Sequence, residues 1–319
     1  MKLIEIKQRD KAMQITWVIN NICTNACSYC PSGLHNGKNH HYEWDNAKRF
    51  VDQLLIRYPK INLSIAGGEP TLSPHLPELV KLFFDRGHTI SLTSNGARSV
   101  RYYDAIAKNL NGMCFSFHPS FEEAGFMDKV IATSHYCFTT VRVMMDTRYW
   151  DRCVNFYNSI IDNMDISVEP VRIQDWGIGN TVGRDYTEEQ EQWFNDRPMR
   201  PARFFEETKN PEVPMWCDYY YNNGEIDTSG RHPLYLINSK QNDFRGWECD
   251  IGLESLFIHY DGAIQRANCR QGTPTRFFGN VNQPESIIWP TQPEICSQRE
   301  CHCATDIIVS KRLLLLSKT

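Results

Sequence analysis

Strands and helices alternate along the first half of this sequence, and the alternation restricts the fold more than any other feature does. Short apolar runs such as MQITWVIN (13–20) and HTISLTSNG (88–96) have the composition of β-strands. Amphipathic segments lie between them, and one, HLPELVKLFFDRG, ends on Gly87, a residue type favoured after helix C-termini. Six strands in this pattern over about 160 residues predict parallel pairing through right-handed helical crossovers.

The predicted fold class is therefore α/β, with a partial (β/α)6 TIM-like barrel over residues 1–185. The segment 186–245 differs in composition, being rich in Glu, Asn, Pro and aromatic residues, and we expect it to connect two domains. In the last part, 246–319, LESLFIHYDGAIQR predicts a β-hairpin that turns at Asp261-Gly262. The chain is thus expected to hold a barrel, a connecting segment and a small C-terminal domain.

Four polar loops follow four of the predicted strands. They are CTNACSYC (23–30), GGEP (67–70), TSNG (93–96) and HPS (118–120). Loops that follow parallel strands converge on one rim, where α/β proteins place their active sites. The sequence therefore predicts one composite site at this rim.

Twelve cysteines are many for a chain without a secretory signal, and the N-terminal MKLIEIKQRDKAM is interrupted by charges. We therefore expect a cytoplasmic protein, in which clustered cysteines are metal ligands more often than disulfides. Four cysteines stand singly and are expected to be small buried residues: Cys114, Cys137, Cys153 and Cys217. The other eight form two groups: Cys23, Cys27 and Cys30 near the start, and Cys249, Cys269, Cys296, Cys301 and Cys303 near the end.

Charge and hydropathy argue against two classes of partner. The formal net charge of −4 is spread along the chain without a long basic run, which gives no reason to expect nucleic acid. No apolar stretch approaches the length of a membrane span. We therefore expect neither nucleic acid nor a membrane as partner.

Three thiolates on one short loop can hold three corners of a metal centre. A structural zinc ion takes four protein ligands, and His35, His40 or His41 just downstream could complete a Cys3His site. A 4Fe–4S cluster held by three cysteines instead leaves one iron open to a further ligand. The loop by itself leaves both alternatives open.

The order of the motifs favours the cluster. Cysteines separated by three and then two residues, with an aromatic residue before the last, are followed by GGEP and TSNG on the next strands, and together these motifs resemble the radical S-adenosylmethionine (radical SAM) superfamily. The resemblance covers about residues 14–175. It implies a cluster at Cys23, Cys27 and Cys30 that binds S-adenosylmethionine (SAM). It also implies a set of residues at the SAM site: Tyr29, Gly67, Gly68, Glu69, Pro70, Thr93, Ser94, Asn95, Ser116 and Arg142.

The family implies a mechanism as well. The amino and carboxylate groups of SAM chelate the open iron, and the amino group is expected at GGEP. The reduced cluster then cleaves the sulfonium C–S bond, and the 5′-deoxyadenosyl radical takes a hydrogen atom from the substrate. The electron is expected to come from a donor such as a flavodoxin or ferredoxin.

The fourth strand departs from the family pattern. In FSFHPSF, His118 stands where the family often has an acid two residues after the serine. We expect His118, Arg142, Asp146 and Glu169 to be candidates for the barrel interior, where an arginine could bind the SAM carboxylate in a bidentate manner. For each, a charge paired for structural reasons is the alternative.

The second cysteine group resembles the twitch or SPASM extensions of radical SAM enzymes, in which a cysteine, a β-hairpin and a second cysteine follow one another. The full SPASM pattern has more cysteines and two clusters, whereas the five present here fit one auxiliary 4Fe–4S cluster of the twitch type. We favour Cys249 and Cys269, with two of Cys296, Cys301 and Cys303, and expect the cluster to accept an electron. A small zinc ribbon, with His302 as a ligand, is the alternative.

The predicted function is thus that of a radical SAM enzyme of the oxidoreductase type, with the specific reaction left open. About thirteen residues before the first predicted strand leave no room for a leader-peptide domain, so we favour a small-molecule substrate. A peptide-crosslinking or epimerising enzyme is the alternative. A non-catalytic iron–sulfur or zinc module is the competing class, and the presence of GGEP and TSNG argues against it. No catalytic acid or base is predicted.

Overall fold

The structure is a computed structural model, and it divides into two compact units, each built from separate stretches of the chain. One unit contains Met1–Trp17, His41–Ser64 and Pro211–Thr319, and the other contains Val18–His40 and Ile65–Asn210. The structure describes residues 2–37, 43–121, 124–173, 183–196, 217–229, 236–237, 240–269, 277–301 and 303–314.

The second unit is built on parallel strands in the order β4-β5-β6-β7. Strand β7 lies at an edge of the sheet, so the sheet is open, as a partial barrel requires. The predicted α/β class with parallel strands is confirmed. The strands are β4 (Thr89–Ser94), β5 (Gly112–Phe117), β6 (Phe138–Met145) and β7 (Ser167–Arg172).

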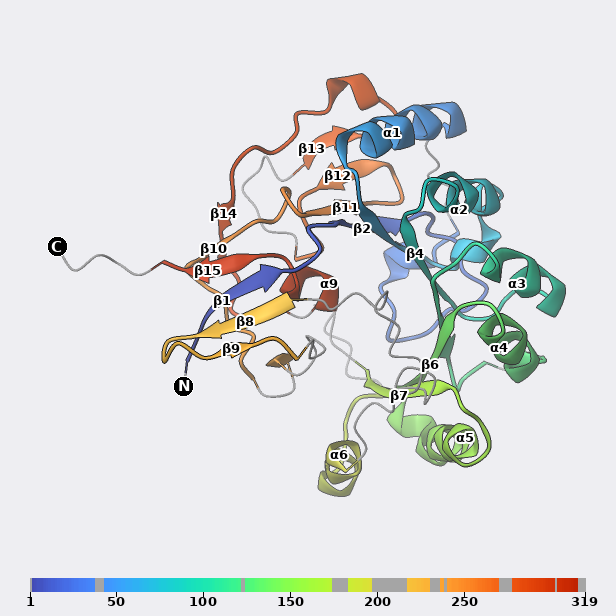
Figure 1. Cartoon of the computed structure of the whole chain (residues 1–319). Helices are drawn as coiled ribbons and strands as arrows, with labels where there is room; N and C mark the ends of the chain where they lie inside the picture. Colours follow the sequence, from blue (N-terminus) through green and yellow to red (C-terminus); the bar gives the residue numbers. More distant parts are fainter. Residues whose placement is uncertain are drawn as a thin grey trace. The chain divides into compact units, whose positions relative to one another are not determined.

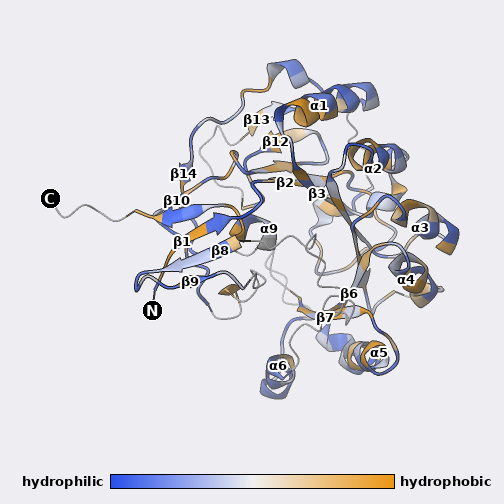
Figure 2. Cartoon of the chain, in the orientation of Figure 1, coloured by the Kyte–Doolittle hydropathy of each residue, from blue (hydrophilic) through white to orange (hydrophobic). Residues whose placement is uncertain are grey.

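Helices alternate with these strands, and Figure 1 shows α3, α4 and α5 together on one side of them. The helices mix hydrophobic and hydrophilic residues along their lengths, as expected for helices with one buried side (Figure 2). The first turn of α3 is capped by the Ser99 hydroxyl, which accepts from the Tyr102 N–H. The helices are α2 (Leu76–Phe84), α3 (Val100–Ala107), α4 (Phe126–Ser134), α5 (Trp150–Asn163) and α6 (Glu188–Asn195), with short 3-10 turns η1 (Ser32–Leu34), η2 (Pro70–Leu72) and η3 (Thr147–Tyr149).

The two faces of the parallel strands differ in polarity. Residues that point to one face are buried and apolar, among them Leu92, Phe115 and Val143. The alternate residues of β5 and β6 include Ser116 and Arg142, which are opposite each other in the strand register. Because successive side chains of a strand point to opposite faces, polar groups gather on the face away from the apolar core.

The first unit contains the strand order β13-β12-β11-β2-β3 and the helix α1 (Trp44–Arg57). Strands β11 and β12 form the predicted antiparallel hairpin, and Gly262 at its turn has a positive φ of 83°. Strand β11 also pairs with β2 in parallel, which the sequence did not predict. The strands are β2 (Met13–Val18), β3 (Ile61–Ala66), β11 (Ser255–Ile258), β12 (Ala263–Gln265) and β13 (Phe277–Asn280), and the turn η4 (Pro284–Ser286) follows.

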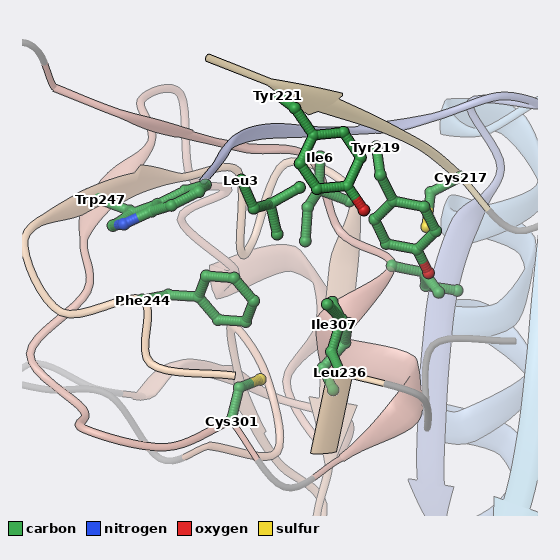
Figure 3. Packing of buried hydrophobic residues seen from close by; sticks show 11 residues of the cluster. Leu3, Ile6, Cys217, Tyr219, Tyr221, Leu236, Phe244, Trp247, Cys301 and Ile307 are labelled. Carbon is green, nitrogen blue, oxygen red and sulfur yellow. The ribbon is translucent and has the colours of Figure 1, made fainter. Parts of the chain in front are cut away.

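A second sheet of the same unit has the order β14-β10-β15-β1-β8-β9. Its core is shown in Figure 3, where Leu3 and Ile6 lie among Tyr219, Tyr221 and Phe244. The elements are β1 (Leu3–Gln8), β8 (Cys217–Tyr221), β9 (Ile226–Asp227), β10 (Trp247–Cys249), β14 (Glu294–Ile295), β15 (Lys311–Leu313) and the short helix α9 (Ala304–Ile307).

Two details of the predicted elements need correction. The first strand of the chain is β1 and not β2: its charges at Glu5 and Lys7 alternate with buried residues, so they belong to a half-buried strand. The amphipathic segment from Glu122 to Thr133 also predicts a helix; in the structure this helix, α4, begins at Phe126, and Glu122 itself lies outside the described residues. No helix among the described residues has the length and apolar character needed to cross a membrane.

Candidate active site

The cysteine loop begins where β2 ends and is joined to the GGEP turn by backbone hydrogen bonds. The Gly68 N–H donates to the Asn20 carbonyl (3.0 Å) and the Glu69 N–H to the Ile22 carbonyl (2.6 Å). The buried Asn20 side chain adds a third bond, from Nδ2 to the Glu69 carbonyl (2.9 Å). Two of the predicted motifs therefore form one connected piece of backbone.

Close packing explains why glycines stand at this turn. A Cβ atom on Gly68 would lie 2.3 Å from the Leu34 carbonyl oxygen and 2.4 Å from that of Ile22. A Cβ atom on Gly67 would lie 2.9 Å from the Asn20 carbonyl oxygen. These are backbone atoms and cannot move aside as a flexible side chain would, so Gly68 in particular is required for the approach of the cysteine loop.

Glu69 binds the ends of two neighbouring strands together. Its side chain is fully buried, and Oε1 accepts from the Thr71 N–H (3.1 Å), the Thr71 hydroxyl (2.6 Å) and the Ser94 hydroxyl (2.7 Å). Its Oε2 accepts from the Asn95 N–H (2.7 Å). Burial raises the pKa of this carboxyl group, and the four donors oppose that rise. The carboxylate thus joins GGEP to TSNG, with Pro70 buried beside it in the first position of η2.

Asn95 continues this network to the cysteine loop. Its Nδ2 donates to the Thr24 hydroxyl (3.0 Å) and lies 3.5 Å from Cys23 Sγ, while its Oδ1 accepts from the Ala97 N–H (3.0 Å). Cys23 Sγ also accepts from the Asn25 N–H (3.3 Å). The structure therefore brings GGEP, TSNG and the first cysteine together, as the sequence predicted for one composite site.

Cys27 and Tyr29 are buried against His118, which follows β5. His118 Nδ1 lies 2.8 Å from Tyr29 Oη and 3.4 Å from Cys27 Sγ, and the rings of Tyr29 and His118 stack with centroids 6.1 Å apart. Desolvation lowers the pKa of His118 to about 4, so the imidazole is neutral near pH 7. Cys27, Tyr29 and Ile173 form an apolar cluster against which Cys30 packs.

The three thiols of the loop share one environment, and this chemistry fits a cluster. Burial, with a smaller contribution from neighbouring thiolates of the loop, raises the pKa of Cys27 to about 11 and that of Cys30 to about 12. Without positive charge the thiols would stay protonated near pH 7, whereas the iron of a cluster supplies the charge that thiolates need. No set of three or more His, Cys, Asp or Glu side chains within the described ranges converges on a single metal-ion position. A cubane does not need such convergence, because each thiolate binds a different iron atom.

The remaining predicted SAM-site residues lie on the strands of the same unit. Thr93 stands beside Cys114 in the register of β4 and β5, and Ser116 stands beside Arg142 in that of β5 and β6. The Arg142 guanidinium is half exposed, and its Nε donates to Glu169 Oε2 (2.8 Å). Arg142 is therefore paired with an acid, which is the alternative that the sequence left open for it.

Arg148 is a site contact that the sequence did not reveal. It donates through its backbone N–H and its Nε to Oδ1 of the fully buried Asp146 (3.0 and 2.9 Å). Its Nη2 then reaches Ser28 Oγ (2.8 Å), within the cysteine loop. The contact spans 120 residues of sequence, and nothing in the local pattern around Arg148 distinguishes it from a surface arginine.

A cavity of about 330 Å³ opens beside the loop. Asn25, Asn95 and His118 line it together with apolar residues that include Phe117, Phe121 and Phe126. Asn25 is buried, and its Nδ2 has no hydrogen-bond partner among the residues that the structure describes. Because a buried amide donor without a partner costs free energy, this atom indicates a place for a ligand acceptor.

The second cysteine group lies in the other unit. Cys249 packs with Ile251, Ala267 and Val309, and Cys269 packs against this cluster. Cys301 belongs to the neighbouring core of Leu3 and Ile6, against which Cys296 packs. The Cys303 Sγ lies 2.8 Å from the Thr305 hydroxyl, and His302 lies outside the described residues.

Two buried charges accompany these cysteines. Asp306 accepts from the Cys269 N–H (2.8 Å) and the Asn268 N–H (3.3 Å), and burial raises its pKa to about 6. Lys311 Nζ donates to three backbone carbonyls, and its positive charge lowers the pKa of Cys249 and Cys301 against the stronger effect of burial. A buried lysine beside several thiols favours their thiolate form, which is the form that binds metal.

Comparison with known proteins identifies the domain. Residues 17–151 match the model of the Radical SAM superfamily. The chain carries a Radical SAM domain. The match includes the cysteine loop, GGEP, TSNG and Ser116, and the superfamily implies a 4Fe–4S cluster and SAM as cofactors and supports an enzymatic function. No curated protein matches the chain in sequence.

Solved structures support the fold. The crystal structure of Streptococcus suis SuiB aligns with a TM-score of 0.54 and 13% identity over 85% of the chain. The structure of SuiB bound to its precursor peptide SuiA aligns with a TM-score of 0.53, also at 13% identity over 85% of the chain. The chain spans about 64% of the length of SuiB, and at this identity the likeness shows the fold alone.

The role of Glu69 in the Radical SAM domain gives a stability prediction. We expect Glu69→Ala to lower the free energy of unfolding by about 3 kcal/mol, because the donors of Thr71, Ser94 and Asn95 lose their buried acceptor. Glu78→Ala, at an exposed position on α2, should change it by less than about 0.5 kcal/mol. Urea denaturation followed by circular dichroism measures the free energy of unfolding of both variants. Equal losses in the two variants would contradict the role of Glu69 in joining GGEP to TSNG.

Proposed function

We propose that this chain holds a 4Fe–4S cluster on Cys23, Cys27 and Cys30 and uses it with SAM to start a radical reaction. When bound, the cluster and SAM supply the one-electron cleavage of a sulfonium C–S bond to a 5′-deoxyadenosyl radical. The observation that carries the proposal is the connection of three motifs. Glu69 joins GGEP to TSNG, Asn95 of TSNG reaches Cys23, and Cys30 packs against the apolar cluster that contains Cys27.

The residues around the loop have separable roles in this proposal. The backbone carbonyls of Gly67 and Gly68 are proposed to accept the SAM ammonium, at a turn where glycine also permits the close approach of the cysteine-loop backbone. Asn25 Nδ2, which has no partner among the described residues, donates to an acceptor of the ligand in the adjoining cavity. Tyr29, Thr93 and Ser116 contribute the wall of the site. Glu69, Pro70, Ser94 and Asn95 hold its shape.

Arg142 remains a candidate for the cofactor or substrate side, together with its partner Glu169. A half-exposed arginine that is already paired can exchange its acid for a ligand carboxylate at low cost, since both bonds have the same chemistry. We therefore propose that the Arg142–Glu169 pair orients a charged group of the ligand. The apolar wall of Phe117, Phe121 and Phe126 would exclude water from the radical.

The five C-terminal cysteines are proposed to hold one auxiliary 4Fe–4S cluster. The packing of Cys269 against the cluster that contains Cys249 supports their use as two ligands, with two more from Cys296, Cys301 and Cys303. The role proposed for this cluster is to accept an electron from the substrate radical, which gives a net two-electron oxidation. In this proposal residues 1–185 form the radical SAM core, 186–245 the connection and 246–319 the twitch-like domain.

The iron content of cysteine variants tests the assignment of one cluster to each group of cysteines. Anaerobically reconstituted protein should bind about eight irons, and a variant with alanine at Cys23, Cys27 and Cys30 should keep about four. A Cys249→Ala/Cys269→Ala variant should lose the other four and still cleave SAM, because its loop and GGEP turn are intact. Iron analysis and the yield of 5′-deoxyadenosine measure these effects. Zinc in place of iron in the C-terminal group would contradict the auxiliary cluster.

The substrate class that we favour is a small organic molecule. The cavity of about 330 Å³ suits a small molecule or one side chain, and its lining combines phenylalanines with Arg152 and Asp128. A peptide is the second candidate, favoured by the fold shared with SuiB, whose structure holds a precursor peptide. A flavodoxin or ferredoxin is the proposed electron donor.

The experiment that tests the proposed function is the reaction with SAM. Reconstituted and reduced protein should form 5′-deoxyadenosine from SAM. When candidate substrates labelled with deuterium are added, deuterium found in the 5′-deoxyadenosine should show which substrate class donates the hydrogen atom. Protein that binds only zinc and leaves SAM intact would overturn the proposal in favour of a non-catalytic module.

A further inference from the structure

Three polar atoms meet at one of the proposed cluster ligands, and family membership does not account for the contact. His118 Nδ1 lies 2.8 Å from Tyr29 Oη and 3.4 Å from Cys27 Sγ. The Tyr29 hydroxyl also hydrogen-bonds Cys27, so the phenol lies between the imidazole and the thiol. Tyr29 and Cys27 are each 5% exposed, so water does not compete strongly for these bonds.

Counting hydrogens assigns the directions of the bonds. A metal-bound thiolate has no proton and only accepts, so a hydrogen bond to Cys27 must come from Tyr29 or His118. If Tyr29 donated to Nδ1 of His118, an imidazole lone pair would face the thiolate and no donor would remain for the sulfur. The favourable arrangement has His118 Nδ1–H donating toward Tyr29 Oη and the Tyr29 O–H donating to Cys27 Sγ. In this chain His118 polarises the hydroxyl that reaches the sulfur.

The three thiols differ in their hydrogen bonds. Cys23 Sγ receives a backbone N–H and lies near the Asn95 amide, whereas Cys30 packs in the apolar cluster with Ile173. Cys27 lies beside two ionisable side chains that also contact each other, because His118 Nδ1 is 3.4 Å from its Sγ and 2.8 Å from Tyr29 Oη. Substitution at His118 therefore changes the environment of one sulfur without changing the cysteine ligands.

We propose that His118, acting through Tyr29, raises the reduction potential of the cluster bound at Cys27. This inference rests on the proposed function, because it requires the cluster. Reduction adds one electron from an external donor and increases the negative charge on the cysteine sulfurs, so a donor to Cys27 stabilises the reduced form more than the oxidised form. No proton is transferred, since both His118 and Tyr29 keep theirs. His118 is thus a positioning residue that acts on the cluster through a second side chain.

The test is a redox titration with dithionite, followed by electron paramagnetic resonance of the reduced cluster, without SAM. It uses the full chain with Cys249→Ala and Cys269→Ala, so that the signal comes from one cluster. His118→Phe keeps an aromatic ring against Tyr29 but removes the donor. We expect it to disfavour the reduced form about tenfold at a fixed potential, a shift of about 59 mV to lower potential for a one-electron couple.

Three further variants separate a hydrogen-bond effect from a structural one. Tyr29→Phe should lower the potential in the same direction, and the double variant with His118→Phe should add little, because the two residues form one chain. His118→Asn, which places an amide N–H near the position of Nδ1, should restore most of the potential. His88→Phe is the matched control: His88 is also buried against a phenylalanine, Phe83, but precedes β4 at the strand end away from the loop.

Each outcome decides the proposal. A potential in His118→Phe equal to that of the parent, with four irons retained, would overturn it, as would an additive double variant. Nitrogen hyperfine coupling that disappears in His118→Phe would also overturn it, because His118 would then be an iron ligand. If His118→Phe does not take up iron, Tyr29→Phe and His118→Asn decide in the same way. If the potential falls as expected in His118→Phe but the parent forms no 5′-deoxyadenosine, only the proposed function is contradicted. If the parent cleaves SAM fully but the variants have its potential, only this inference is contradicted.

Discussion

Gly68→Ala is expected to abolish assembly of the first cluster while leaving the second intact. The new Cβ would lie within 2.3 Å of the Leu34 carbonyl oxygen and 2.4 Å of the Ile22 carbonyl oxygen. Both atoms belong to the backbone on either side of the three cysteines, so relief of the clash must displace the cysteine loop. Overpacking of this kind costs about 3 kcal/mol or more, which corresponds to roughly a 100-fold loss in the population of the competent loop.

Gly33→Ala is the matched control for this substitution. Gly33 lies in η1, close in sequence to Leu34, but a Cβ at this position would meet no atom within 4 Å. We expect Gly33→Ala to keep about eight irons and normal SAM cleavage, and Gly68→Ala to keep about four irons and produce no 5′-deoxyadenosine. Normal activity in Gly68→Ala would show that the GGEP turn and the cysteine loop do not pack as the structure has them.

Alanine at Cys23, Cys27 or Cys30 is the second change with a large expected effect. Each single variant removes one of three thiolates, and a cluster with two ligands cannot keep a defined open iron for SAM. We expect 5′-deoxyadenosine formation to fall to the background of protein without iron in all three variants. Iron analysis should show loss from the first cluster only.

Cys153→Ala controls for the loss of a buried thiol. Cys153 is fully buried on α5, and its Sγ donates to the Met144 carbonyl (3.4 Å), so the variant should be less stable. It should nevertheless retain SAM cleavage, because it is not a proposed ligand. Full activity in any of the three loop variants would remove that cysteine from the ligand set and with it the proposed cluster.

The strand pattern and the loop motifs could be predicted because their signals are local. The alternating strands, the helix ending before Gly87 and the hairpin at Gly262 depend on short-range composition and on backbone conformations that glycine favours. Strand β1 was missed because its charges suggested a polar terminus, although they alternate with residues that contact β8 and β15. Those partners lie about 200 and 300 residues away, and no local pattern reveals them.

The internal bonding of the site could not be predicted for a similar reason. The motif placed Glu69 near the ammonium of SAM, whereas the structure shows its carboxylate accepting from Thr71, Ser94 and Asn95. The contact of Arg148 with Ser28 depends on where β6 ends relative to the cysteine loop. Such contacts arise from tertiary packing, so the sequence indicates which residue types gather but not which atoms bond.

The formation of methionine and 5′-deoxyadenosine from SAM tests the central claim most directly. Reconstituted protein and the Cys23→Ala/Cys27→Ala/Cys30→Ala variant would be incubated with SAM and dithionite without oxygen, and both products would be quantified by mass spectrometry. We expect equal amounts of the two products from the parent protein and neither product from the variant. Intact SAM in the parent protein, with a full complement of iron, would contradict it.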